Sequence, residues 1–161
     1  MDLDGIPLTM IDGTPTTLGA YADKVVLVVN VASRCGFTAQ YAQLEALQRT
    51  YADRGFTVLG FPSNQFLQEF GSAESIAEFC STTFGVSFPM FEKVKVNGRG
   101  AHPLFAALHD VPDPAGSAGK VRWNFEKFLL TPAGEAHRFR SAVTPDDPAV
   151  VSLIEAALPV G

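Results

Sequence analysis

A short apolar run that ends in a cysteine-containing turn constrains the fold of this chain most. Residues Val25–Val31 read VVLVVNV, rich in β-branched side chains and too short to span a bilayer. Such a run is typical of a strand buried on both faces, as in the centre of a parallel sheet. The residues Ser-Arg-Cys-Gly (33–36) interrupt it, and a helical pattern begins near Thr38. We therefore expect Cys35 at a strand-to-helix turn, where the helix dipole and unpaired N–H groups favour a thiolate.

The pattern that follows predicts a parallel strand pair. A helix is expected over residues 39–52, because an apolar stripe recurs at three- and four-residue steps. Residues 56–61 form a second apolar run, and strand, helix and strand in this order make a βαβ unit. The loop after this second strand, residues 62–71, should then lie at the same sheet edge as Cys35.

The remaining elements complete an α/β pattern. Residues 6–11 and 16–18 predict an N-terminal hairpin around a two-residue Asp12-Gly13 turn, where both residues favour positive φ. Helices are expected over residues 73–84, 102–109 and about 147–158, and a second hairpin over 121–130 and 136–140. The sum is a mixed central sheet flanked by helices. It resembles the thioredoxin-like fold with an added N-terminal β-hairpin.

Composition narrows the class of protein. The 161 residues are enough for a single domain, residues 1–161, and only 18% are charged, below the roughly 25% of typical domains. A net charge of −5 without a basic patch argues against nucleic acid as a partner. We see no secretory signal and no run of the ~18 apolar residues that a membrane span needs. A cytoplasmic location with two reduced cysteines is the expectation.

Cys35 offers single-thiol chemistry. Thioredoxin-type oxidoreductases carry Cys-x-x-Cys at this turn, but here Thr38 takes the second position. A lone thiolate can displace one oxygen of a peroxide and become a sulfenic acid. The alternative is that Cys35 is a small buried hydrophobic residue, as free cysteines often are.

Three motifs decide between these alternatives. The segments NVASRCGFT, FPSNQFLQEFG and WNFEKF occur in this order, and together they resemble the glutathione peroxidase family in its cysteine form. The resemblance covers nearly the whole chain. It implies that Cys35 is the peroxidatic residue and that Gln68, Trp123 and Asn124 complete the site. An indole N–H and two amides can donate hydrogen bonds to the sulfur and to the peroxide oxygens without carrying charge.

The second motif departs from the family pattern. Ser63 stands where a cysteine is usual, Leu67 where a glycine and one more residue are usual, and Phe70 where a proline is usual. The loop is therefore one residue shorter. Gln68 is our choice for the amide because Gln-Glu-x-Gly is kept around it, and Gln65 is the alternative.

The reductant is the open part of the prediction. Cysteine-form relatives often use a resolving cysteine in the helix after the glutamine loop, and then thioredoxin. Cys80 lies in that helix, one position before the commonest resolving position, held here by Ser81. It also shares an apolar stripe with Ile76 and Phe79, so burial is the alternative role. A disulfide with Cys35 needs the two Cα atoms within about 7 Å.

The expected activity is a thiol peroxidase that reduces hydrogen peroxide and organic hydroperoxides, lipid hydroperoxides included, with thioredoxin or glutathione as reductant. A peroxide sensor that passes oxidation to a partner protein is the alternative. We expect no cofactor and no metal, because His102, His109 and His137 are scattered and lack ligand spacing. The short segment over residues 111–120 resembles that of monomeric relatives rather than of tetrameric ones, which carry an extra loop there.

Overall fold

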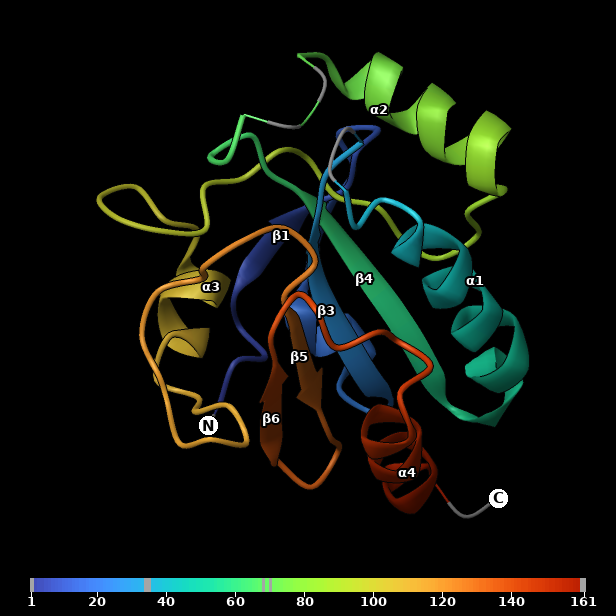
Figure 1. The fold of residues 1–161 in the computed structure, drawn as a ribbon, viewed down its shortest axis with the longest axis vertical. Coiled ribbons are helices and arrows are strands. Elements are labelled where there is room, and N and C mark those ends of the chain that lie inside the picture. The colour runs from blue at the N-terminus through green and yellow to red at the C-terminus, as the bar shows by residue number, and fades with distance from the viewer. Residues whose placement is uncertain (1, 34–35, 68, 70, 160–161) are drawn as a thin grey trace.

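The described residues form a four-stranded mixed sheet at the centre of the fold (Figure 1). The structure is a computed structural model that describes residues 2–33, 36–67, 69 and 71–159. The sheet order is β4-β3-β5-β6, with β3 at Val25–Val31, β4 at Phe56–Pro62, β5 at Lys127–Leu130 and β6 at Ala136–Phe139. β3 and β4 are parallel, while β5 runs antiparallel to β3 and β6 antiparallel to β5. The predicted parallel pair and the second hairpin are confirmed.

Both faces of the sheet are covered. One face of β3 presents Val25, Leu27, Val29 and Val31 to a core that includes residues of α1 (Gln40–Tyr51), α2 (Ala73–Phe79) and α4 (Pro148–Ala157). The alternate side chains, Val26 and Val28, pack in a second core with α3 (Pro103–Leu108) and the N-terminal segment. Both sets are buried because successive side chains of a strand point to opposite faces, as expected for a central strand.

The N-terminal hairpin is present, but its predicted turn is wrong. β1 (Pro7–Thr9) pairs with β2 (Pro15–Thr17), and a 3₁₀ helix, η1 (Leu18–Tyr21), leads toward β3. The Met10 N–H donates to Thr14 O, so the loop is longer than two residues. Gly13 has a φ of +93°, whereas Asp12 does not adopt a positive φ. This geometry is that of a type I turn followed by a left-handed glycine.

The helix predicted over residues 73–84 is divided. Ser72 caps α2 by accepting a hydrogen bond from the Ser75 N–H, as a serine at this position should. After Phe79 the chain widens into a π-helix, η3 (Cys80–Phe84), which ends at Gly85 with a φ of +58°. A short 3₁₀ helix, η2 (Ala52–Arg54), similarly extends α1.

The predicted strand over residues 121–130 is too long, and this correction matters for the site. β5 begins at Lys127, because residues 123–126 leave the sheet in a turn where Phe125 has a φ of +61°. The carboxyl ends of β3 and β4 lie at the same edge of the sheet, toward α2 at the top of Figure 1. No helix of the described part of the chain is long and apolar enough to cross a membrane.

Candidate active site

Segments from all three sequence motifs meet at this sheet edge. The Glu69 carboxylate, in the loop after β4, accepts a hydrogen bond of 3.1 Å from the Ser33 N–H, just after β3. The Phe66 and Trp123 rings lie with centroids 5.1 Å apart. Asn30 of β3 donates from its side-chain amide to Trp123 O at 2.9 Å. The structure therefore brings together three segments: the cysteine segment (residues 30–38), the glutamine loop (62–71) and the tryptophan turn (123–126).

Cys35 and Gln68 lie outside the described residues, so their roles stay predictions. Residues three positions before and after Cys35 are described: Ala32 is fully buried, and the Thr38 hydroxyl donates to Ala32 O at 3.1 Å. Thr38, which occupies the position of the second cysteine in thioredoxins, thus ties the start of the helix back to the end of β3.

Gln65, the alternative to Gln68, has a different task. Its side-chain oxygen accepts hydrogen bonds from the Val96 N–H at 2.6 Å and the Asn97 N–H at 2.8 Å. Its side-chain nitrogen donates to Asn97 O at 3.0 Å. These three bonds attach the loop after β4 to residues 96–97.

Trp123 and Asn124 occupy one turn but differ in exposure. Trp123 is 37% exposed, so its indole can meet a molecule arriving from solvent, whereas Asn124 is fully buried. The next residue, Phe125, has left-handed backbone geometry, which costs about 1–3 kcal/mol for a residue with a side chain. The turn is therefore held against its local preference by its surroundings.

Buried charges lie behind this turn. Glu126 forms ion pairs with Arg138 at 2.5 Å and Arg140 at 2.9 Å, and the first of these pairs is fully buried. The ammonium of Lys127, also buried, donates to Phe125 O at 2.5 Å. Burial lowers the pKa of Lys127 to about 7, although the charge of Glu126 opposes this shift. Sequence patterns do not predict this network, because charged side chains in a strand pattern are usually assigned to the surface.

Comparison with known proteins shows which family this chain resembles. The family model for glutathione peroxidase matches residues 6–109. The thioredoxin/glutathione peroxidase BtuE of Escherichia coli (strain K12) is 48% identical, over 92% of each chain. The hydroperoxy fatty acid reductase gpx1 of Synechocystis sp. is 49% identical, over 89% of each chain.

The chain belongs to the glutathione peroxidase family. The expected class of activity, a thiol peroxidase acting on hydroperoxides, follows from this membership. Solved structures agree on the fold: the apo crystal structure of Trgpx superposes with a TM-score of 0.72 at 36% identity, over 99% of both chains. A thioredoxin family protein of Chlorobium tepidum, 19% identical, matches with a TM-score of 0.62 over 99% of both chains, so the thioredoxin-like fold is confirmed.

Cys80 of this glutathione peroxidase family chain is buried, as the apolar stripe predicted. Only 2% of the residue is exposed, whereas the neighbouring Ser81 is exposed. The pKa of the Cys80 thiol is raised to about 11, mainly by burial; a hydrogen bond with the Tyr41 hydroxyl opposes this shift, and the charge of Glu69 adds to it. The pKa of Tyr41 is itself raised, mainly by burial and then by the charges of Cys80 and Glu69. In this conformation Cys80 is therefore a protonated thiol at neutral pH.

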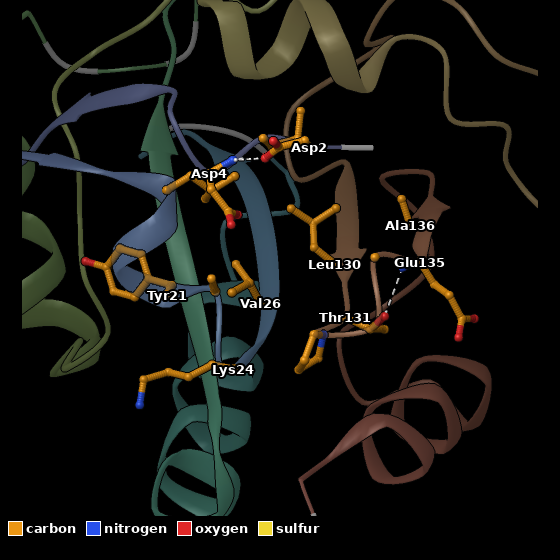
Figure 2. A pocket seen from close by; sticks show the side chains of 14 residues that line it. Asp2, Asp4, Tyr21, Lys24, Val26, Leu130, Thr131, Glu135 and Ala136 are labelled. Atoms are coloured by element: carbon orange, nitrogen blue, oxygen red, sulfur yellow. Dashed lines mark hydrogen bonds between the residues drawn. The ribbon is translucent and has the colours of Figure 1, made fainter.

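A pocket of about 250 Å³, shown in Figure 2, has none of the described candidate site residues in its lining. It opens between the N-terminal segment, the start of β3 and the turn from β5 to β6. Asp2, Lys24 and Glu135 are among its lining residues. The candidate active site is thus an open sheet edge rather than this pocket.

The histidines do not form a metal site within the described part of the chain, where no cluster of three or more metal-binding side chains occurs. His102 caps α3, accepting from the Leu104 N–H, and His109 lies 2.7 Å from Val96 O just after α3. His102 and His109 thus stand at the two ends of α3.

The state of Cys80 gives a testable rate difference. In a Cys35→Ser background, alkylation of Cys80 by iodoacetamide at pH 8 should be at least about a hundredfold slower than alkylation at position 81 in a Cys80→Ser, Ser81→Cys variant. A pKa of about 11 instead of 9.0 alone reduces the thiolate about a hundredfold. Equal rates in the folded proteins would contradict the buried thiol, and equal rates in urea serve as the control.

Proposed function

We propose that Cys35 is the peroxidatic cysteine of this thiol peroxidase. Its thiolate attacks one oxygen of a hydroperoxide, a sulfur–oxygen bond forms, and the oxygen–oxygen bond breaks. The products are a Cys35 sulfenic acid and, after protonation of the leaving oxygen, an alcohol or water. The observation that carries this proposal is the convergence of the three motif segments through Asn30, Trp123 and the Glu69–Ser33 contact.

We assign the polar groups of the reaction to Trp123, Asn124 and Gln68. The indole and the two amides would donate to the sulfur and to the departing oxygen, where negative charge develops. The hydrogen bonds that occupy the Gln65 side chain support Gln68 as the amide of the second motif.

The substrate class that we propose includes hydrogen peroxide and organic hydroperoxides, lipid hydroperoxides among them. Leu67 and Trp123 are the large apolar side chains exposed in the described part of the chain, 84% and 37% respectively. Leu67 follows Phe66, whose ring contacts Trp123. The surface formed by Phe66, Leu67 and Trp123 beside the candidate site is therefore apolar. The name of the Synechocystis relative, a hydroperoxy fatty acid reductase, also supports an apolar substrate.

For recycling we propose that Cys80 attacks the sulfenic acid of Cys35. A disulfide forms, water leaves, and thioredoxin then reduces the disulfide back to two thiols. The name of the Escherichia coli relative includes thioredoxin and supports this donor over glutathione alone. Because the Cys80 thiol is buried with a pKa of about 11, the segment Cys80–Phe84 must open locally before it reacts.

Turnover with thioredoxin, thioredoxin reductase and NADPH tests the enzyme. The unmodified chain should consume many equivalents of hydrogen peroxide, with glutathione and its reductase supporting a slower rate. Cys35→Ser should reduce the rate at least about a thousandfold, because the nucleophile is lost. A Cys35→Ser variant at the unmodified rate would overturn the assignment, and a single equivalent consumed without turnover would indicate the sensor.

Peptide mapping without reductant tests the role of Cys80. After one equivalent of peroxide we expect a Cys35–Cys80 disulfide. Cys80→Ser should retain the first oxidation step but lose turnover with thioredoxin. A stable sulfenic acid or glutathione adduct on Cys35 beside a free Cys80 thiol would rule out the resolving role.

We also propose a monomer that works in a reducing, cytoplasmic environment, where thioredoxin can recycle its disulfide. The short segment over residues 111–120 supports the monomer, since it lacks the extra loop that tetrameric relatives carry there. Light scattering on the purified protein should therefore give a mass near 17.2 kDa. A mass of four chains would contradict the monomer.

A further inference from the structure

The tryptophan turn lies where β5 separates from β3. β5 pairs with Val26–Val29 of β3, and the chain before Lys127 departs as the turn of residues 123–126. Asn30 is the next residue of β3 and is fully buried. A buried turn at this place must find partners for its backbone N–H and C=O groups, because the regular ladder has ended.

Asn30 supplies these partners with both its side chain and its backbone. Its side-chain nitrogen donates to Trp123 O at 2.9 Å, and its side-chain oxygen accepts from the Glu126 N–H at 3.1 Å. Its backbone oxygen accepts from the Phe125 N–H at 2.6 Å. The side chain acts as donor and acceptor at once, which an aspartate or a leucine of similar size cannot do.

Lys127 holds the same turn from the other side. Its ammonium donates to Phe125 O at 2.5 Å and to Ser141 O at 3.3 Å. The N–H and C=O groups of Phe125 are therefore both bound, which explains how its left-handed backbone persists. Asn30 and Lys127 thus both hold the turn by hydrogen bonds to its backbone. Of the two, Asn30 is the one that bonds to Trp123.

We infer that Asn30 is a positioning residue for the reaction with peroxide: it fixes the turn that presents the Trp123 indole and the Asn124 amide. The inference rests on the proposed function, because only there do these two side chains act on the sulfur and the peroxide. A displacement of about 1 Å at such groups can reduce a rate about a hundredfold. Asn30 itself acts through the turn and need not touch the substrate.

Two variants and a matched control test this inference. Asn30→Leu removes the side-chain donor and acceptor, and Asn30→Asp keeps only the acceptor for the Glu126 N–H. Val26→Ala is the control, since Val26 is buried in the same strand but pairs with Leu130, away from the turn. Each variant is measured without urea, at a temperature at which its thermal denaturation curve shows that it is folded. If Asn30→Leu does not fold, Asn30→Asp supplies the result.

The readouts are the single-turnover rate of Cys35 oxidation by hydrogen peroxide and the fluorescence of Trp123, the only tryptophan of the chain. Both Asn30 variants should react at least about tenfold more slowly, with a shifted tryptophan emission. Val26→Ala should lose stability yet keep its rate within about twofold and its emission unchanged. A merely structural role for Asn30 would instead make its variants behave like this control.

The outcomes separate this inference from the proposed function. If the unmodified chain reacts with peroxide, Trp123→Phe is slow, and both Asn30 variants react at the unmodified rate, the inference alone is overturned. If Trp123→Phe reacts at the unmodified rate, the role proposed for Trp123 fails and the inference fails with it, whatever the emission of the Asn30 variants shows.

Discussion

The geometry of this site depends on how the buried backbone is satisfied where the sheet ends. β3 pairs along its whole length with β4, but its other edge meets β5 over Val26–Val29 and then a turn. At that point Asn30 takes over the hydrogen bonds that a continuing strand would have made. Because unsatisfied buried polar groups are costly, the turn has little freedom to move. A left-handed Phe125 is tolerated there, and Trp123 is presented at the surface while Asn124 stays inside.

A second buried polar group links the cysteine segment to the neighbouring helix. Glu69 accepts from the Ser33 N–H, and its charge also raises the pKa of Cys80. The same carboxylate thus binds the backbone N–H of Ser33 and adds to the burial that disfavours a thiolate on Cys80. In the proposed function Cys80 therefore waits as a protonated thiol. A peroxidatic cysteine needs a thiolate, whereas a waiting resolving cysteine is protected from oxidation while it stays protonated.

The chain has few charged residues, and several of them are buried in the interior. Glu126, Arg138 and Lys127 are fully buried behind the tryptophan turn. A buried ion pair contributes little net stability against an apolar replacement, but removing one partner is strongly destabilising, by about 3–5 kcal/mol. The network therefore favours one arrangement of β5, β6 and the turn over its alternatives.

The sequence by itself determined the α/β class, the parallel β3–β4 pair and the family, because alternating burial and motif order are properties of local residue patterns. The apolar stripe that contains Ile76 offered burial as one of two roles for Cys80. The sequence did not reveal the task of Gln65, the length of β5 or the role of Asn30, although a single asparagine within VVLVVNV was a visible signal. Tertiary structure decided these features. Hydrogen bonds between residues some 30 to 100 positions apart, such as Asn30 to Trp123, follow from how the elements pack and leave no periodic trace in the chain.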